Sequence, residues 1–97
     1  MERKIIIFGA TGNTGLAICQ ELEINNINHS AFVRKGSEAK FKTPNTNIIT
    51  GDVLVGEDVD KVINENNFTD IIIALGSRNF RAGEIRFNGT KNIINAL

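Results

Sequence analysis

Residues 5–15 constrain the fold more than any other part of the chain. The apolar run Ile5 to Phe8 is followed by glycines at positions 9, 12 and 15, and an apolar-periodic segment continues beyond them. This order predicts a buried strand that turns tightly into a helix. At such a helix start the backbone N–H groups lack intrahelical acceptors, and the helix dipole adds partial positive charge. The turn can therefore bind a diphosphate.

The three glycines have different predicted roles. Gly9 permits the tight turn, Gly12 lets the backbone approach a phosphate, and Gly15 lets the helix lie close to its strand. Their spacing is GxxGxxG, one residue longer than the GxGxxG of many dehydrogenases. Because a strand pattern precedes the glycines and a helix pattern follows them, we predict dinucleotide binding. The alternative is a purely structural glycine turn.

Short apolar runs alternate with helix-like segments along the whole chain. Strands are predicted at residues 5–8, 30–34, 47–50 and 70–75, and helices at 13–25, 38–41, 57–66 and 83–97. Repeated strand–helix–strand units predict one α/β domain over residues 1–97, with a parallel sheet and helices on both faces. The expected strand order is 3-2-1-4, and a ligand should lie beyond the carboxyl ends of the strands. Nearly unbroken apolar strands fit a sheet that is covered on both sides.

The composition excludes several classes of function. Eleven basic and eleven acidic residues give a net charge of zero, which favours neither nucleic acid nor an acidic membrane surface as a partner. No apolar run approaches the ~20 residues that span a bilayer, and no signal peptide is visible. Cys19 is the only cysteine, so no internal disulfide forms, and we expect a cytoplasmic protein in which Cys19 packs as a small apolar residue. No Cys/His cluster favours a metal site.

The residues after the second strand bear on the choice of nucleotide. Many NAD-binding domains place an acidic residue ~20 positions after the glycines, where it binds the ribose 2′-hydroxyl. This chain has Arg34 and Lys35 there, with Ser37 close behind. A guanidinium and a hydroxyl can bind a 2′-phosphate, so the sequence favours NADP over NAD. The alternative is a solvated strand end. The single histidine, His29, is predicted at the surface or in a turn, away from the site.

The loops after the third and fourth strands add further candidates. Asp52 is placed to accept a hydrogen bond from the adenine amino group, and Val53 to pack near the ring. The alternative for Asp52 is an ordinary turn aspartate that caps the next segment. The loop after the fourth strand contains Gly76, Ser77 and Arg78, beside the expected position of the diphosphate and the nicotinamide ribose.

Several of these motifs occur together in the order found in one group of enzymes. They are Ile7 to Leu16, Val33-Arg34, Gly51 to Leu54, Asp58 to Lys61, and Leu75 to Asn79. With them the chain resembles the biliverdin-IXβ reductase family, also called NADPH-dependent flavin reductases, within the NmrA-like atypical short-chain dehydrogenases. The resemblance covers the chain but only the N-terminal half of such an enzyme. Gly89, Thr90 and Asn92 also resemble a Gly-Thr-x-Asn helix of extended short-chain dehydrogenases.

The resemblance implies an oxidoreductase that passes a hydride from NADPH to a flavin, a tetrapyrrole or a similar small-molecule acceptor. Its implied contacts are Gly9, Thr11, Gly12, Asn13 and Thr14 with the pyrophosphate, Arg34 and Ser37 with the 2′-phosphate, Asp52 and Val53 with adenine, and Leu75, Gly76, Ser77 and Arg78 with the ribose and nicotinamide. The alternatives are a non-catalytic NADP sensor of the NmrA type and a nucleotide-sugar epimerase. The chain has no tyrosine for the usual Tyr-Lys pair of an epimerase.

The chain departs from this family pattern in two places. Relatives usually have an arginine directly after the serine, whereas this chain has Glu38, which weakens the case for NADP unless Lys35 or Lys40 compensates. The sequence also stops at Leu97 before any fifth strand. The resemblance therefore implies a C-terminally incomplete Rossmann fold that binds the ADP portion of the cofactor and lacks much of the substrate site. No residue of this sequence is predicted to donate a proton to the acceptor.

Overall fold

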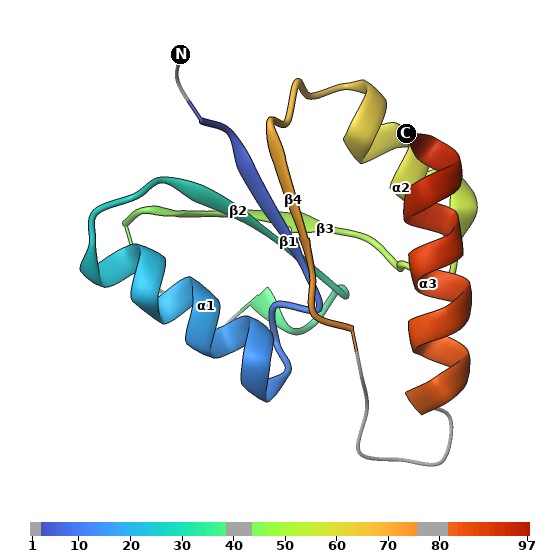
Figure 1. Ribbon diagram of the computed structural model, residues 1–97, viewed down its shortest axis with the longest axis horizontal. Helices are drawn as coiled ribbons and strands as arrows, with labels where there is room; N and C mark the ends of the chain where they lie inside the picture. Colours follow the sequence, from blue (N-terminus) through green and yellow to red (C-terminus); the bar gives the residue numbers. More distant parts are fainter. Residues whose placement is uncertain (1–2, 39–43, 76–81) are drawn as a thin grey trace.

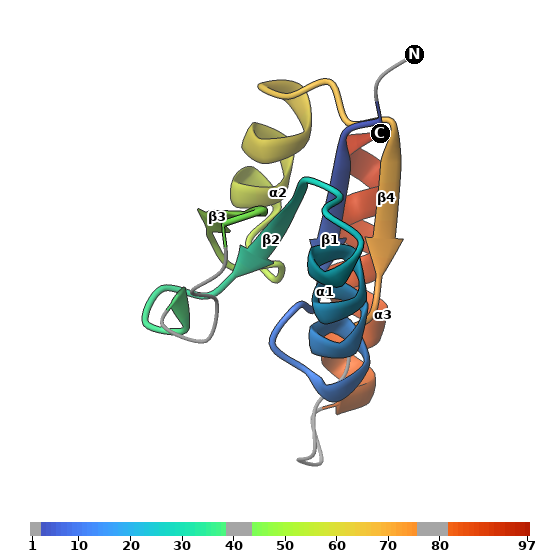
Figure 2. The ribbon, with the colours of Figure 1, turned by 90° about the vertical axis from the view of Figure 1, so that its left-hand side faces the viewer.

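A computed structural model describes residues 3–38, 44–75 and 82–97 as a four-stranded parallel sheet with three helices (Figure 1). The elements are β1 (Ile5–Phe8), α1 (Asn13–Ile24), β2 (His29–Val33), β3 (Thr46–Thr50), α2 (Gly56–Asn64), β4 (Asp70–Ile73) and α3 (Ala82–Ala96). Figure 2 shows the strand order β3-β2-β1-β4. The predicted α/β class and strand order are confirmed. Of the predicted helix at 38–41, only Glu38 lies within the described residues.

The strand register brings the carboxyl ends of the strands to one edge of the sheet. Phe8 in β1 pairs with Phe32 in β2 and with Ile73 in β4, while Val33 pairs with Thr50 in β3. The ends of β1, β2 and β4 therefore lie side by side, next to the turn that follows β1. After β1 the chain crosses to β2 and β3 on one side, and then returns to β4 on the other side. This reversal is the kind of position where α/β sheets bind ligands.

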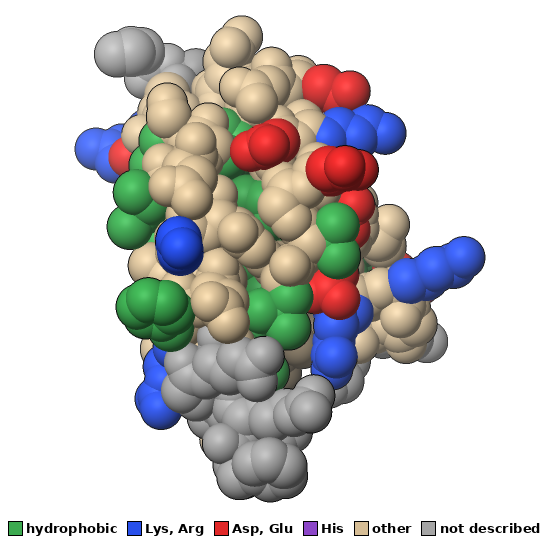
Figure 3. All heavy atoms as spheres, turned by 90° about the vertical axis from the view of Figure 1, so that its right-hand side faces the viewer, with side chains coloured by type: hydrophobic (Ala, Val, Ile, Leu, Met, Phe, Trp, Pro, Cys, Tyr) green, Lys and Arg blue, Asp and Glu red, His purple; other side chains and the backbone are tan. Residues whose placement is uncertain are grey.

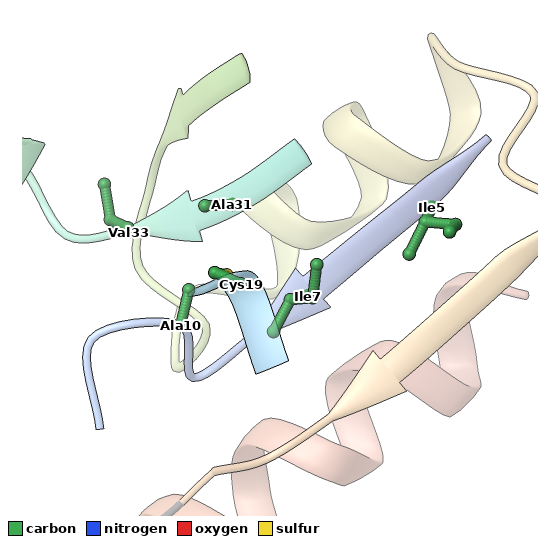
Figure 4. Packing of buried hydrophobic residues seen from close by; sticks show 6 residues of the cluster. All are labelled: Ile5, Ile7, Ala10, Cys19, Ala31 and Val33. Carbon is green, nitrogen blue, oxygen red and sulfur yellow. The ribbon is translucent and has the colours of Figure 1, made fainter. Parts of the chain in front are cut away.

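The sheet separates two apolar clusters. Helix α1 covers one face, and α2 and α3 cover the other (Figure 1). Alternate residues of β1 serve the two sides: Ile5 and Ile7 pack toward α1, whereas Ile6 and Phe8 pack toward α2 and α3. On the α1 side, Cys19 lies among side chains of β1 and β2 (Figure 4), as predicted for a small apolar residue.

Strand β4 is less covered than the sequence predicts. All four residues of β1 are buried, but Ile73 in β4 is 40% exposed. The reason is position, since β4 forms an edge of the sheet and β1 lies in its interior. β4 also ends at Ile73 rather than at Leu75. β1 leaves the sheet at Gly9, so the last bond between the two strands is Ala74 N–H to the Phe8 carbonyl, at 2.9 Å.

His29 is buried, contrary to the prediction of a surface or turn position. It is the first residue of β2 and only 3% exposed. Its Nδ1 lies 2.9 Å from the Ile27 carbonyl oxygen, and its Nε2 lies 2.9 Å from Thr46 Oγ1. These two contacts explain how a polar ring is tolerated there. The ring lies at the amino end of β2, at the opposite edge of the sheet from the carboxyl ends of the strands.

The helical layer of α2 and α3 has a mixed outer surface. Gly89 and Ile93 of α3 face the core, while Phe87 and Ile94 are exposed. Figure 3 shows hydrophobic side chains among charged ones on this side of the molecule. No helix among the described residues is long and apolar enough to cross a membrane.

Candidate cofactor-binding site

Two of the three glycines between β1 and α1 are required by close backbone contacts. Gly9 has a φ of +83°, and a Cβ on it would lie 2.4 Å from the Ala74 carbonyl oxygen. A Cβ on Gly15 would lie 2.0 Å from the Gly9 carbonyl oxygen. Any side chain at either position would force the backbone apart. Gly9 therefore sets the turn beside the end of β4, and Gly15 lets α1 pack directly on that turn.

Gly12 is not required by packing within the chain. Its φ is −75°, and among the described residues a Cβ there would meet only the Gly9 carbonyl oxygen, at an ordinary contact distance of 3.6 Å. The residue is exposed at the N-cap of α1. The space in front of it is open to a ligand, and a side chain would occupy that space. This geometry fits the predicted approach of a diphosphate to the backbone.

The first turn of α1 also contains no acidic side chain that would occupy its N-terminus. Gly12 provides no side-chain cap, and the first turn contains no acidic residue. Helix α2 differs, because Glu57 and Asp58 both lie in its first turn. A carboxylate near a helix N-terminus is stabilised by the dipole and would repel an incoming phosphate. Of the two helices, α1 is therefore the one suited to bind an anion.

A cleft of about 190 Å³ lies next to this turn, at the carboxyl ends of β2 and β3. Its lining consists of Gly9, Thr11, Phe32, Val33, Arg34, Gly51, Asp52, Val53, Leu54, Leu75 and Ile85. Six predicted site residues thus come together: Gly9, Thr11, Arg34, Asp52, Val53 and Leu75. Gly12, Asn13, Thr14 and Gly15 lie at the adjoining start of α1, and Ser37 lies in the turn after β2. Gly76, Ser77 and Arg78 lie outside the described residues.

Arg34 is placed where a cation can act on a ligand in the cleft. It follows β2, is exposed, and lines both the cleft and an adjoining hollow of about 420 Å³ that Lys35 also lines. Within the part of the chain that the structure describes, neither cation forms an ion pair. The Ser37 N–H donates to the Arg34 carbonyl at 3.0 Å, which turns the chain back beside Arg34. The basic group and the hydroxyl are therefore near each other in the fold.

Asp52 holds the loop after β3 in shape. Its Oδ1 accepts a hydrogen bond of 2.9 Å from the Leu54 N–H, and its own N–H donates to Asp58 Oδ2 at 2.9 Å. The bond to Leu54 is that of a turn aspartate, but Asp52 does not cap α2, because the N-cap of that helix is Val55 and has no side-chain hydrogen bond. The contact with adenine stays a prediction, and Asp52 Oδ2 has no partner among the described residues.

Helix α3 fixes the positions of Val53 and Leu75. Asn92 Nδ2 donates a hydrogen bond of 2.9 Å to the Val53 carbonyl oxygen. A Cβ on Gly89 would lie 2.7 Å from Leu75 Cδ1 and 3.2 Å from the Val53 methyl groups, so these side chains pack directly against the backbone of the helix at Gly89. The Gly-Thr-x-Asn pattern noted in the sequence thus has a structural role: it presses α3 against two residues that line the cleft.

The predicted site residues did not include five residues of the lining, namely Phe32, Val33, Gly51, Leu54 and Ile85. A Cβ on Gly51 would lie 2.6 Å from Phe32 Cζ, so the ring lies flush against the Gly51 backbone. Phe32 also packs against Phe8 in a tilted arrangement, with 4.9 Å between ring centroids and 47° between the ring planes. A signal for Phe32 was present: it precedes Arg34 by two residues, and alternation along a strand places such a pair on one side.

Residues 9–97 match the model of the NAD(P)H-binding family. The chain belongs to this family. The match begins at the first glycine of the turn and includes every strand after β1. The family is defined by binding of NAD(P)H. The glycine turn and the adjoining cleft are the parts of this chain to examine for such binding.

Solved structures share the fold at low sequence identity. The enzyme WbmH from Bordetella bronchiseptica, in complex with NAD+, matches with a TM-score of 0.78 and 16% identity over 99% of this chain and 35% of its own. A short-chain dehydrogenase/reductase from Vibrio parahaemolyticus matches with 0.76 and 14%, over 96% and 54%. The anaerobillin reductase ChuY from Escherichia coli O157:H7 matches with 0.74 and 17%, over 96% and 44%. The chain thus spans between about a third and about half of these proteins.

Proposed function

We propose that this chain is the dinucleotide-binding half of an NADPH-dependent oxidoreductase that transfers a hydride to a flavin, a tetrapyrrole or a similar acceptor. The observation that carries the proposal is the cleft between the glycine turn and Arg34. At one end it adjoins the N-terminus of α1, whose first turn has no acidic residue, and at the other it has the Arg34 guanidinium, which forms no ion pair among the described residues. A molecule with a diphosphate and a second, more distant phosphate has charges that match these two ends.

The described residues fit the ADP portion of the cofactor. In the proposed arrangement the diphosphate binds backbone N–H groups at the start of α1, where Gly12 leaves the approach open. The adenosine occupies the cleft, whose apolar lining includes Val33 and Val53. The 2′-phosphate is bound by Arg34 and Ser37. NADP is favoured over NAD because Arg34 and Lys35 directly follow β2, where many NAD-binding domains have an acidic residue.

The nicotinamide supplies the hydride when the cofactor is bound, and the protein contributes position and exclusion of water. Leu75 lines the cleft on the β4 side and is held by the close approach of Gly89. It is the described residue best placed to pack near the nicotinamide ribose. The proposed contacts of Gly76, Ser77 and Arg78 fall on residues outside the described part of the chain.

A flavin or tetrapyrrole acceptor is supported by the motif resemblance. The anaerobillin reductase matched above is built on the same fold, so this fold accommodates a tetrapyrrole reductase in another protein. A flavin accepts hydride at a ring nitrogen and a linear tetrapyrrole at a bridge carbon between two rings, and either can take its proton from solvent.

The test uses the longest product of the gene that contains this sequence. NADPH affinity is measured first by the change in nicotinamide fluorescence, and NADPH oxidation is then followed at 340 nm with FMN or biliverdin as acceptor. We expect saturable binding and acceptor-dependent oxidation. Tight binding without turnover of any acceptor would favour an NADP sensor, and interconversion of a nucleotide sugar would favour an epimerase. Absence of dinucleotide binding would overturn the proposal.

A further inference from the structure

The first turn of α2 supplies a hydrogen-bond acceptor to the loop that follows β3. The Asp52 N–H donates to Asp58 Oδ2 at 2.9 Å, and Asp58 is half-buried at the start of the helix. The two segments also lie close together, because a Cβ on Gly51 would be 3.4 Å from Asp58 Cβ. A carboxylate from the next helix therefore fixes the peptide between Gly51 and Asp52.

Asp52 is held by two further hydrogen bonds. Its carbonyl oxygen accepts from the Val55 N–H at 2.9 Å, and its Oδ1 accepts from the Leu54 N–H at 2.9 Å. Both of these bonds stay within the short segment between β3 and α2, whereas the bond to Asp58 comes from the body of the helix. Asp52 lines the cleft, and its Oδ2 has no partner among the described residues. The residue is thus fixed while one carboxylate oxygen is left for a ligand.

Stabilisation of the helix does not account for the position of Asp58. Glu57 and Asp58 both lie in the first turn of α2, where the helix dipole stabilises a negative charge. Glu57 is exposed, but Asp58 reaches back to a backbone N–H six residues earlier in the sequence. This bond brings a second carboxylate close to Asp52, an arrangement that the dipole alone does not require. Asp58 therefore has a separate role in the loop.

We propose that Asp58 is a positioning residue, which directs the Asp52 carboxylate toward the amino group of the bound adenine. The inference rests on the proposed function, because that function places the adenosine in this cleft. Without Asp58 no side-chain acceptor fixes the Asp52 N–H, and Gly51 has no side chain to restrict rotation of the peptide. A fixed carboxylate, which only accepts hydrogen bonds, prefers the amino group of adenine to the carbonyl oxygen that hypoxanthine has at the same ring position.

The test compares NADPH with reduced nicotinamide hypoxanthine dinucleotide phosphate by titration calorimetry, using the longest product of the gene. The unsubstituted protein should bind NADPH at least about tenfold more tightly than the analogue, from the strength of a hydrogen bond to a charged group. In Asp58→Ala this ratio should fall below about threefold. Both ligands are titrated against one preparation, so a smaller folded fraction in the variant lowers both apparent stoichiometries and leaves the ratio of affinities unchanged.

Two further single variants separate the hydrogen bond from the charge. Asp58→Asn keeps an acceptor oxygen without the charge, so it should retain most of the preference for NADPH. Glu57→Ala removes the other acidic side chain of the same helical turn, and this matched control should retain the preference in full. A preference lost equally in Asp58→Asn and Asp58→Ala would overturn the inference, because the charge and not the bond would then be responsible. An equal loss in Glu57→Ala would overturn it for the same reason.

A double variant tests whether Asp58 acts through Asp52. Asp52→Ala should remove the preference for NADPH, and adding Asp58→Ala to it should change the ratio by less than about twofold, because the two residues act on one contact. A further large fall in the ratio would overturn the inference, since Asp58 would then act on adenine by another route.

The remaining outcomes separate the inference from the function on which it rests. An unchanged ratio in Asp58→Ala would overturn the inference and leave dinucleotide binding intact. Equal affinities of the unsubstituted protein for the two dinucleotides would also overturn it, because Asp52 would then not recognise the amino group, while NADPH binding would stand. If the unsubstituted protein binds neither dinucleotide, both the proposed function and the inference fail.

Discussion

Asn92 on α3 donates a hydrogen bond of 2.9 Å from Nδ2 to the carbonyl oxygen of Val53, in the loop that lines the cleft. The two residues are 39 positions apart in the sequence. The contact ties a helix on one face of the sheet to a loop at the carboxyl end of β3. The shape of the cleft therefore depends on α3, although Ile85 is the one residue of that helix in the lining among those whose side chains the structure describes.

Asn92→Ala should loosen this loop. The change leaves the partly buried Val53 carbonyl without its donor, so we expect a loss of about 1 kcal/mol in the free energy of unfolding. NADPH affinity should fall by roughly threefold to tenfold, because about 1 kcal/mol corresponds to a factor near five. Urea denaturation and NADPH titration measure the two effects. Asn88→Ala is the matched control, since Asn88 lies exposed on the same helix; equal effects of both substitutions would contradict a specific role for Asn92.

Gly12→Val should abolish dinucleotide binding while the protein stays folded. A branched side chain fits the extended backbone at position 12, where a Cβ has ordinary contacts, so we expect a stability loss of no more than about 1–2 kcal/mol. The side chain would occupy the approach of the diphosphate. Calorimetry with NADPH, combined with thermal unfolding, tests both statements. Unchanged NADPH affinity in this variant would remove the assignment of the glycine turn.

Gly15→Ala should mainly reduce the stability of the fold, whereas Gly12→Val should mainly reduce dinucleotide binding. Its Cβ would lie 2.0 Å from the Gly9 carbonyl oxygen, which forces α1 away from the turn. We expect a loss of roughly 3 kcal/mol or more in stability, at the upper end of single-residue effects. Thermal unfolding of the two glycine variants, measured side by side, shows whether packing and ligand approach are separate requirements. A Gly15→Ala protein as stable as the unsubstituted chain would contradict the close contact.

Arg34→Glu should weaken NADPH binding far more than NADH binding. Only NADPH has a 2′-phosphate, and the substitution replaces an attractive charge with a repulsive one next to it. We expect a loss of about 10- to 100-fold for NADPH and less than about threefold for NADH, from the strength of charge-assisted bonds to phosphate. Lys61→Glu, an exposed charge reversal on α2, is the control. Equal losses for both dinucleotides would place the 2′-phosphate elsewhere.

The thiol of Cys19 should be unreactive in the folded protein. Burial raises its pKa from 9.0 to about 11, so the thiol stays protonated at neutral pH. The pKa is higher in the folded state than in the unfolded state, and the related stability is therefore present below pH 9 and lost as the pH rises to about 11. Unfolding free energies measured across this range should fall more steeply for the unsubstituted protein than for Cys19→Ala. Parallel curves would contradict the effect of burial.

Much of the fold follows from local patterns. The apolar run from Ile5 to Phe8, followed by Gly9, predicts a buried strand and its turn, and repeated strand–helix units predict the strand order. Arg34 and Asp52 could be predicted as neighbours because parallel strands end at one edge of the sheet. These inferences need only hydrophobic period, glycine positions and the handedness of the crossovers.

Other features depend on contacts between distant residues and could not be predicted in this way. The burial of His29 requires Thr46 as a partner on the next strand, and the fit of Phe32 against Gly51 requires the register of β2 and β3. The exposure of Ile73 follows from its place at an edge of the sheet, although its apolar neighbours favour an interior position. Each of these depends on the assembled sheet, which local sequence patterns do not specify.

The position of the coenzyme diphosphate is tested most directly by a crystal structure of the protein soaked with NADPH. We expect the diphosphate oxygens within hydrogen-bond distance of backbone N–H groups at the start of α1, next to Gly12, and the 2′-phosphate beside Arg34. A dinucleotide bound elsewhere would contradict the proposed function. So would an empty turn at saturating NADPH.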